Sequence, residues 1–246
     1  MSGDALGALL LGVLLGIRHA LDADHVVAVS TIVSSYRNPL RAAWVGISWG
    51  LGHTTTLVLV GATIILLRLA IPDRLALFFE FAVGMVLVGL GLQVLWGLWR
   101  KQLHGHQHEH PETVHTHLHS HEPSPDHDHP SAEDWRRGAW LRPAFRGKSY
   151  LVGSLHGLAG SAALVLLVLS TIKSPSLGVL YLFIFGLGSV LSMGVLTVMM
   201  GLPFSLSARA PALNRLVQMA AGVGSVGLGI FLMYEIGLVE GLFLAA

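Results

Sequence analysis

The apolar residues of this chain gather in long runs that are separated by short polar stretches. A helix needs about 20 apolar residues to cross the hydrocarbon core of a bilayer, and runs near or above that length recur in both halves of the sequence. They predict six membrane-spanning helices, near residues 5–34, 42–70, 75–99, 149–172, 177–203 and 213–239. The predicted fold is an all-α polytopic membrane protein.

Composition supports lipid as the solvent. Hydrophobic residues make up 53% of the chain and charged residues 12%, against about 25% charged in an ordinary soluble domain. The chain has no cysteine, which excludes disulfides and a thiolate metal cage. The formal charge of +1 gives no indication of a nucleic-acid partner. Because residues 1–17 contain no Lys or Arg, we expect the first run to be retained rather than cleaved as a signal peptide.

Basic residues are distributed unequally between the two sides that six spans would define. One side holds Arg37, Arg41, Arg100, Lys101, Arg136, Arg137, Arg142, Arg146, Lys148, Arg209 and Arg215. The other side holds Arg68, Arg74 and Lys173. Because Lys and Arg accumulate in cytoplasmic loops, the bias predicts a cytoplasmic-membrane protein with both termini outside.

The two halves of the chain echo one another in the same order. AVGMVLVGLG at 82–91 returns as AAGVGSVGLG at 220–229, GLGH at 50–53 as GLGS at 186–189, and HAL at 19–21 as HGL at 156–158. A repeat of three spans must enter the membrane from opposite faces, which is typical of transporters. We therefore predict two inverted three-helix repeats, 1–99 and 149–246, joined by a loop at 100–148. The glycines themselves need no function, because small residues let membrane helices pack closely.

A charged motif, RHALDADH at 18–25, interrupts the first apolar run. Each Arg or Asp at mid-membrane costs about 2.5–3.5 kcal/mol on insertion scales, so these groups must face protein, water or an ion. On an ideal helix His19, Asp22 and His25 share one face, whereas Asp24 points elsewhere. The run is also too long for one straight span. A break inside the motif would solve both problems and bring two imidazoles and two carboxylates to one point.

These ligands favour a divalent transition metal. Neutral imidazoles and carboxylates suit Ni²⁺, Co²⁺, Zn²⁺ or Mn²⁺ better than Cu⁺. Arg18 is a poor ligand, and we expect it to pair with one of the aspartates.

The motif resembles the R-H-A-x-D-A-D-H signature of the nickel/cobalt transporter family. LGHTTTL at 51–57 is similar to that family's second signature, in which Gly-His precedes two Ser or Thr residues. The resemblance implies metal uptake, with His19, Asp24 and His25 as the core of the site and His53 as a further contributor. The longer members have two later signatures that are missing here, so the chain looks more like the short, six-span branch of urease-associated nickel permeases.

Two other membrane histidines have competing interpretations. A single histidine in an apolar span is often a hydrogen-bonded packing residue. His156, however, corresponds to His19 in the repeat, and inverted repeats build one site where they meet. We therefore include His53 and His156 in the predicted metal site with His19, Asp22, Asp24 and His25. The prediction for His156 is that it lies across the membrane midplane from His19 and within reach of the same ion. Both rings would face a polar cavity lined also by His53, with about 4–8 Å between neighbouring rings.

Most of the 14 histidines lie between 104 and 129, among prolines. This composition predicts a disordered cytoplasmic loop that collects metal loosely, or else a plain solvated linker.

The predicted function is a permease for Ni²⁺ or Co²⁺, which needs no catalytic residue and no resident cofactor. The bilayer and the ion are its expected partners, with a cytoplasmic nickel chaperone as a further candidate. A membrane metalloenzyme would need more histidine ligands than the spans contain, so we do not expect an enzyme. A sensor or accessory protein that delivers nickel without moving it, and a metal exporter, remain alternatives. The sequence leaves open the preferred metal, the direction, proton coupling, the oligomeric state and any need for the loop.

Overall fold

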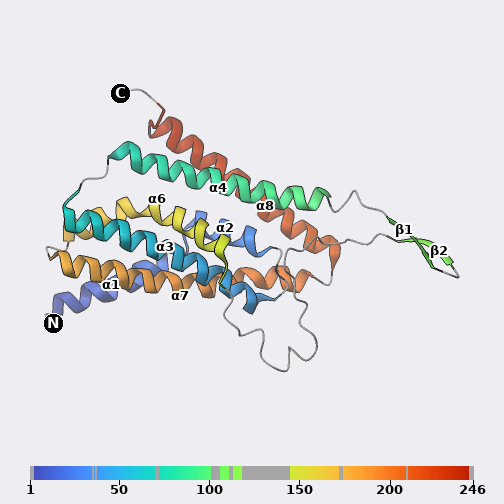
Figure 1. Cartoon of the computed structure of the whole chain (residues 1–246), viewed down its shortest axis with the longest axis horizontal. Coiled ribbons are helices and arrows are strands. Elements are labelled where there is room, and N and C mark those ends of the chain that lie inside the picture. Colours follow the sequence, from blue (N-terminus) through green and yellow to red (C-terminus); the bar gives the residue numbers. More distant parts are fainter. Residues whose placement is uncertain are drawn as a thin grey trace.

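The computed structural model describes residues 3–34, 36, 38–69, 72–100, 106–110, 113–117, 145–171, 174–208 and 210–243 of the chain. Its helices are α1 (Gly3–His19), α2 (Ala23–Val33), α3 (Pro39–Leu67), α4 (Asp73–Arg100), α6 (Gly147–Thr171), α7 (Pro175–Ser207), α8 (Pro211–Tyr234) and the π-helix η2 (Glu235–Val239). Two short strands, β1 (His106–His110) and β2 (Thr113–His117), follow α4 (Figure 1).

The long helices match the predicted apolar runs to within about a turn. Within the described residues, four helices are long and apolar enough to cross a membrane: α3, α4, α7, and α8 together with η2. Leu10–His19 and α2 are shorter apolar helices, and α6 has 25 residues. Helix α7 runs past the predicted end at 203 because Pro203, despite lacking an N–H to donate, is accommodated inside the helix.

The first apolar run is broken, as its motif predicted. Helix α1 ends at His19 and α2 begins at Ala23. Between them, Leu21 N donates to Arg18 O (2.9 Å) and Asp22 N donates to His19 O (3.0 Å). Asp22 then turns into an extended conformation, with φ −61° and ψ 146°, and Val26 N donates to its carbonyl. The break therefore lies at the charged motif.

Local signals fix the other helix starts. Pro39, Pro175 and Pro211 each stand at the beginning of a helix, where the missing N–H costs nothing and the fixed φ suits the first turn. At α3 the side chain of Asn38 also caps the helix by accepting from Leu40 N at 2.9 Å.

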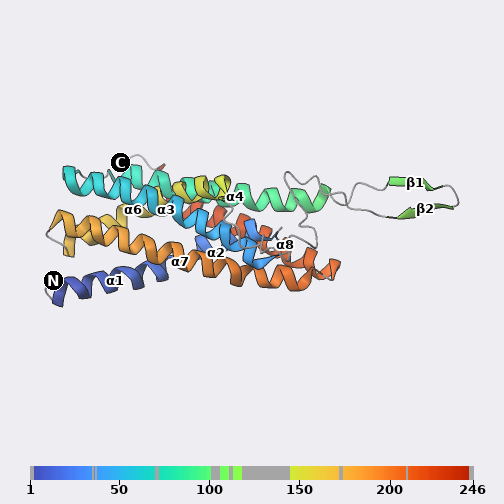
Figure 2. The same ribbon diagram turned by 60° about the horizontal axis from the view of Figure 1, so that its bottom comes forward.

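The helices form two groups that meet around α2 and α6. Helix α3 packs against both α6 and α7, and α1 lies along α7. Helices α4 and α8 pair with one another and touch the first group through α2, α6 and α7. Figures 1 and 2 show α4 and α8 running side by side along the bundle.

Glycines allow α6 to reach the backbone of α3. A Cβ at Gly52 would meet Tyr150 O, and a Cβ at Gly153 would meet Trp49 O. Contacts of the same kind join α1 to α7. There, a Cβ at Gly16 would meet Phe185 O, and one at Gly188 would lie 2.7 Å from Val13 O.

The α4–α8 pair depends on glycines in the same way. A Cβ at Gly229 would lie 2.6 Å from Gly84 O, and one at Gly91 would lie 2.6 Å from Gly222 O. Midway between these contacts, Ser225 Oγ donates to Leu87 O at 2.7 Å. In lipid, where apolar burial gives little drive between helices, such close backbone contact is what holds a pair together.

The segment 100–148 departs from the all-α prediction where it can be described. Strands β1 and β2 pair antiparallel, with His106 opposite His117 and His110 opposite Thr113. The remainder of the predicted disordered loop, including His104, His127 and His129, lies outside the described residues. Disorder there stays a prediction.

Adding a methyl group at a close helix contact should destabilise the bundle. We expect Gly52→Ala and Gly153→Ala each to lower the free energy of unfolding in detergent by about 1–3 kcal/mol, because the new Cβ meets a backbone oxygen that cannot move aside. Gly89→Ala is the matched control, since no atom lies within 4 Å of its Cβ position and alanine favours the helix by about 1 kcal/mol. Equal stability of all three variants would show that the backbones do not approach this closely.

Candidate metal centre

The break between α1 and α2 gathers polar side chains from three parts of the chain. His19 is the last residue of α1, and Asp24 and His25 open α2. Helix α3 contributes His53 and α6 contributes His156. His25, His53 and His156 are buried, with exposed fractions of 2%, 1% and 2%. The sequence-predicted residues of the two halves are therefore brought together.

The four imidazoles form a contiguous group. The ring centroid of His19 lies 4.7 Å from that of His25 and 5.0 Å from that of His53. His25 lies 5.4 Å from His53 and 5.1 Å from His156. One nitrogen each from His19, His25 and His53 lies within 4.8 Å of the other two. Metal–nitrogen bonds are about 2.0–2.1 Å long, so small side-chain movements would let all three bind one ion.

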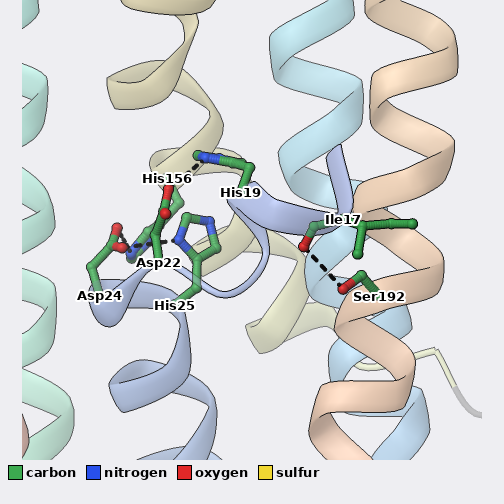
Figure 3. Close-up of polar contacts among 7 residues, drawn as sticks. All are labelled: Ile17, His19, Asp22, Asp24, His25, His156 and Ser192. Atoms are coloured by element: carbon green, nitrogen blue, oxygen red, sulfur yellow. Dashed lines mark hydrogen bonds and ion pairs between the residues drawn. The ribbon is translucent and has the colours of Figure 1, made fainter. Parts of the chain in front are cut away.

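Two carboxylates orient these rings. His19 Nδ1 lies 2.8 Å from Asp22 Oδ2, and His25 Nδ1 lies 3.1 Å from Asp24 Oδ1 (Figure 3). When Nδ1 of a neutral imidazole donates to a carboxylate, Nε2 keeps its lone pair, which is the arrangement found behind metal-binding histidines. Asp24 also reaches across to α6, where its Oδ2 lies 3.5 Å from His156 Nε2.

The nitrogens that face the centre have no protein partner. Among the described residues, none forms a hydrogen bond with His19 Nε2, His25 Nε2 or either ring nitrogen of His53, although all are buried. His156 Nε2 has only the 3.5 Å contact with Asp24 Oδ2. Leaving a buried polar atom unsatisfied costs about 1–3 kcal/mol. Several such atoms in one place are costly in a folded protein unless they serve to bind a ligand, and lone pairs of this kind suit a cation.

Aromatic side chains wall the group on two sides. The ring of Trp49 on α3 lies 4.8 Å from His156, and the ring of Phe185 on α7 lies 5.5 Å from His19. These rings keep the imidazoles in a space of low polarity, where the attraction between a cation and Asp24 is stronger than in water.

The broken end of α1 is satisfied without using the imidazoles. Ala20 N donates to Gly16 O at 3.3 Å, and Ser192 Oγ on α7 donates to Ile17 O at 3.3 Å. Figure 3 shows Ile17 and Ser192 on one side of the break and the labelled histidines and aspartates on the other. The backbone of the break is thus stabilised by α7, which leaves the polar side chains free for another task.

A cavity of about 290 Å³ opens beside the group. It is lined by His19, Asp24, His25 and His156, by Glu80 of α4, and by apolar residues of α4, α6, α8 and η2. The predicted spacing of neighbouring rings is met between His156 and His25, at 5.1 Å. Reach of His156 to an ion shared with His19 stays a prediction, because the nitrogens within 4.8 Å of one another belong to His19, His25 and His53. The prediction that His53 lines the same cavity is wrong, because His53 lies among the packed helices and does not border the cavity. Most of the cavity wall is also apolar rather than polar.

One further detail of the predicted site needs correction, and a metal-ligand role for Asp22 stays a prediction. Arg18 forms no ion pair with Asp22 or Asp24 in the described structure, because both carboxylates bond to histidines instead. The side chain of Asp22 is 52% exposed and holds His19 from outside the imidazole group. We interpret it as a residue that positions His19.

Sequence reasoning missed the residues that surround the ligands. Trp49, Phe185 and Ser192 lie in apolar runs with nothing in the pattern to set them apart, and Glu80 was passed over in the same way. Glu80 had a signal that could have been read, since it is a lone charge inside an apolar run.

Comparison with known proteins finds relatives along the whole chain. It is 40% identical over 240 residues to the urease accessory protein UreH of a Bacillus species, covering 98% of this chain and 96% of the relative. A shorter match, 36% identical over 86 residues, joins it to a high-affinity nickel transport protein of Cupriavidus necator, over 33% of this chain and 23% of that protein. A chloroplast protein of Arabidopsis thaliana, FOR GROWTH AND FERTILITY 1, is 26% identical over 89% of this chain and 56% of its own length.

No family model matches the chain, and no solved structure matches it. The first two relatives are an accessory protein and a transport protein, and neither is an enzyme. The prediction that this chain is not an enzyme is confirmed on that ground.

Binding of a divalent metal should depend on the unpartnered imidazoles. We expect Ni²⁺ to raise the unfolding temperature of the purified protein, since a ligand present at 100 times its dissociation constant adds about 2.7 kcal/mol of stability. His53→Leu should lose that rise while making the metal-free protein more stable, because it removes two unsatisfied buried nitrogens. Thermal unfolding with and without Ni²⁺ measures both effects.

The matched control for this experiment is His104→Leu, which removes one histidine of the histidine-rich segment between 104 and 129 and should leave the nickel-dependent rise unchanged. A full rise in the His53→Leu variant would show that this ring does not bind the ion.

Proposed function

The chain belongs to the family of the urease accessory protein UreH, and we propose that it is a permease that carries Ni²⁺ across the membrane through the site at the α1–α2 break. It is a multi-pass membrane protein. The observation that carries the proposal is the group of buried, unpartnered imidazole nitrogens at a helix break. Broken helices that expose polar groups near the midplane are typical of substrate sites in secondary transporters.

Ligand chemistry supports nickel as the cargo. Three imidazoles and a nearby carboxylate suit Ni²⁺, Co²⁺ and Zn²⁺, with Ni²⁺ accepting tetragonal nitrogen and oxygen sites well. The relative with the shorter match is a high-affinity nickel transport protein, which favours nickel among these. Cobalt is a second candidate cargo that the same ligands would accept.

The packing supports two inverted repeats related by a pseudo-twofold axis. In the sequence echoes, Gly84 corresponds to Gly222 and Gly91 to Gly229. Across the α4–α8 contact, Gly84 meets Gly229, the counterpart of Gly91, and Gly91 meets Gly222, the counterpart of Gly84. A twofold axis produces this reciprocal pattern.

The other helix contacts follow the same rule. The echoes match His19 to His156 and Gly52 to Gly188. Exchanging the two halves then turns the contact of Gly52 with Tyr150 into a contact of Gly188 with Val13, and the structure contains both contacts. The aromatic walls match as well. Trp49 on His156 and Phe185 on His19 are counterparts, which supports a site built where the two repeats meet.

The proposed topology places both termini outside and the histidine-rich loop in the cytoplasm. The start of helix α1 and the C-terminal segment after η2 lie at one end of the bundle. The β1–β2 hairpin lies beyond the other end (Figure 1). Arg41, Arg100, Lys148 and Arg215 stand at helix ends on the hairpin side, as cytoplasmic basic residues would.

The membrane potential can drive import. The chain has no GxxxxGK pattern for binding ATP phosphates. A dication that enters a negative interior gains about 4.6 kcal/mol per 100 mV, from about 2.3 kcal/mol per charge. The membrane potential can therefore drive import without hydrolysis of ATP by this chain.

A second function has one observation in its favour: the relative that matches along its whole length is a urease accessory protein. In that case the chain would bind nickel and pass it to a partner, for instance a cytoplasmic nickel chaperone, without moving it across the bilayer. Uptake of nickel into sealed proteoliposomes that contain only this chain separates the two functions, because an accessory protein would leave the vesicle interior free of metal.

Removing a ligand should abolish transport and leave the fold intact. We expect His19→Ala and His25→Ala proteoliposomes to take up no radioactive nickel, since each loses a nitrogen that faces the centre. Asp24→Asn should lower uptake by about 10–100-fold, because Asp24 supports a ligand ring. Asp73→Asn, at the exposed start of α4, is the control that should transport normally. Near-normal uptake by either alanine variant would remove that histidine from the site.

The topology can be tested because the chain has no cysteine of its own. A single Ser124→Cys in the histidine-rich loop should react with an impermeant thiol reagent only after the cells are opened. Asp73→Cys, at the start of α4, should react in intact cells. The reverse result for the pair would invert the proposed orientation.

A further inference from the structure

Glu80 is a charged residue on α4, a helix long and apolar enough to cross a membrane, and the site described above does not use it. It lies on α4, about two turns after Asp73. Glu80 borders the 290 Å³ cavity that His25 and His156 also border, and it is only partly exposed to solvent. Glu80 and the imidazole group therefore share one space.

Nothing in the described protein neutralises Glu80. No described residue forms a hydrogen bond or ion pair with its carboxylate. A charged group within a membrane-spanning helix is expensive, and such residues usually mark a pathway for ions or substrate. The cost of an unpaired carboxylate here has to be balanced by a function.

The rest of the cavity wall offers a cation very little. Val83, Leu228, Leu232 and Ile236 line it with hydrocarbon, and among the described lining residues the only carboxylates are Asp24 and Glu80. His25 and His156, both 2% exposed, line the same cavity, and His25 Nε2 has no hydrogen-bond partner among the described residues. The cavity thus has ligands at one part of its wall and one isolated carboxylate at another.

Glu80 lies toward the end of the bundle where α4 begins and η2 ends, the end opposite the β1–β2 hairpin (Figure 1). The chain after α8 folds back there, with the ring of Phe243 5.2 Å from that of Phe81. Glu240 is close enough to interact electrostatically with Glu80. The π-helix supplies Ile236 to the cavity, and short π-helical turns are frequent at functional sites.

We propose that Glu80 is a second cation-binding residue, which takes the divalent ion at the α4–η2 end of the cavity and passes it to the imidazole group. The inference rests on the proposed transport function. A carboxylate oxygen binds a hydrated dication without requiring it to lose all its water, whereas nitrogen ligands replace water directly. Glu240 raises the local concentration of cations near the cavity by adding negative charge at that end. No bond other than metal–ligand bonds forms or breaks, and the ion keeps its charge.

The test compares nickel uptake by the full chain and its Glu80→Gln variant in proteoliposomes over a range of nickel concentrations. Loss of the carboxylate should raise the KM for nickel at least 10-fold and leave kcat within about twofold, because the ion still reaches the imidazoles when it is abundant. Nickel binding in detergent, followed by X-ray absorption of the nickel–imidazole ligands, should be unchanged. Asp73→Asn, which removes a charge from the same helix outside the cavity, should leave both parameters as in the wild type.

Glu80→Asp supplies a second, more conservative variant that keeps the charge, and it should recover most of the low-nickel uptake. If Glu80→Gln fails to insert, Glu80→Asp is compared with the uncharged Glu80→Ala. A wild-type KM in Glu80→Asp, whose carboxylate is one methylene shorter, supports cation binding through the charge. A KM in Glu80→Asp as high as that of Glu80→Ala overturns the role of the charge. Wild-type uptake with an unaltered KM in Glu80→Gln overturns the role of Glu80 alone. Absence of uptake by the wild-type chain overturns the transport function and this inference with it.

Discussion

A charged or polar group inside a bilayer has to find a partner, and the arrangement of this protein depends on how the RHALDADH segment meets that requirement. A continuous helix would place Asp24 away from the histidines. The break after His19 turns Asp24 toward His25 and His156, and it lets Asp22 bond to His19. The broken backbone is in turn satisfied by Ser192 on α7. Imidazole nitrogens of His19, His25 and His53 remain without a hydrogen-bond partner among the described residues, and one nitrogen of each ring lies within 4.8 Å of the other two.

Close helix packing makes this arrangement rigid. His53 reaches the group because α3 and α6 meet backbone to backbone at Gly52 and Gly153, with no side chain between them. The same contacts hold Trp49 against His156. A site of this kind needs ligands placed to within a fraction of an ångström, and glycine contacts between long helices place them better than flexible loops do. Packing and ligand geometry are therefore one property of the fold.

The sequence predicted the elements that follow from simple patterns. Long apolar runs gave the helices, and the conflict between Asp24 and its helical neighbours gave the break, because both follow from geometry along a single segment. The echo of His19 in His156 placed two distant residues near one another. Contacts that depend on the rotation of one helix against another could not be obtained in this way. The burial of His53 away from the cavity and the role of Asp22 outside the imidazole group are of this kind, and so is the continuation of α7 past Pro203.

The two halves share their packing contacts but differ in what they contribute to the site. The first half carries Asp24 and His25, whereas the corresponding positions in the second half are Ser161 and Ala162. In the proposed repeat, a duplicated framework with candidate ligands mainly in one copy would separate two kinds of evolutionary change. Substitutions in the second copy would reshape the space around the ion, and so its choice of metal, while the first copy would keep the proposed ligands.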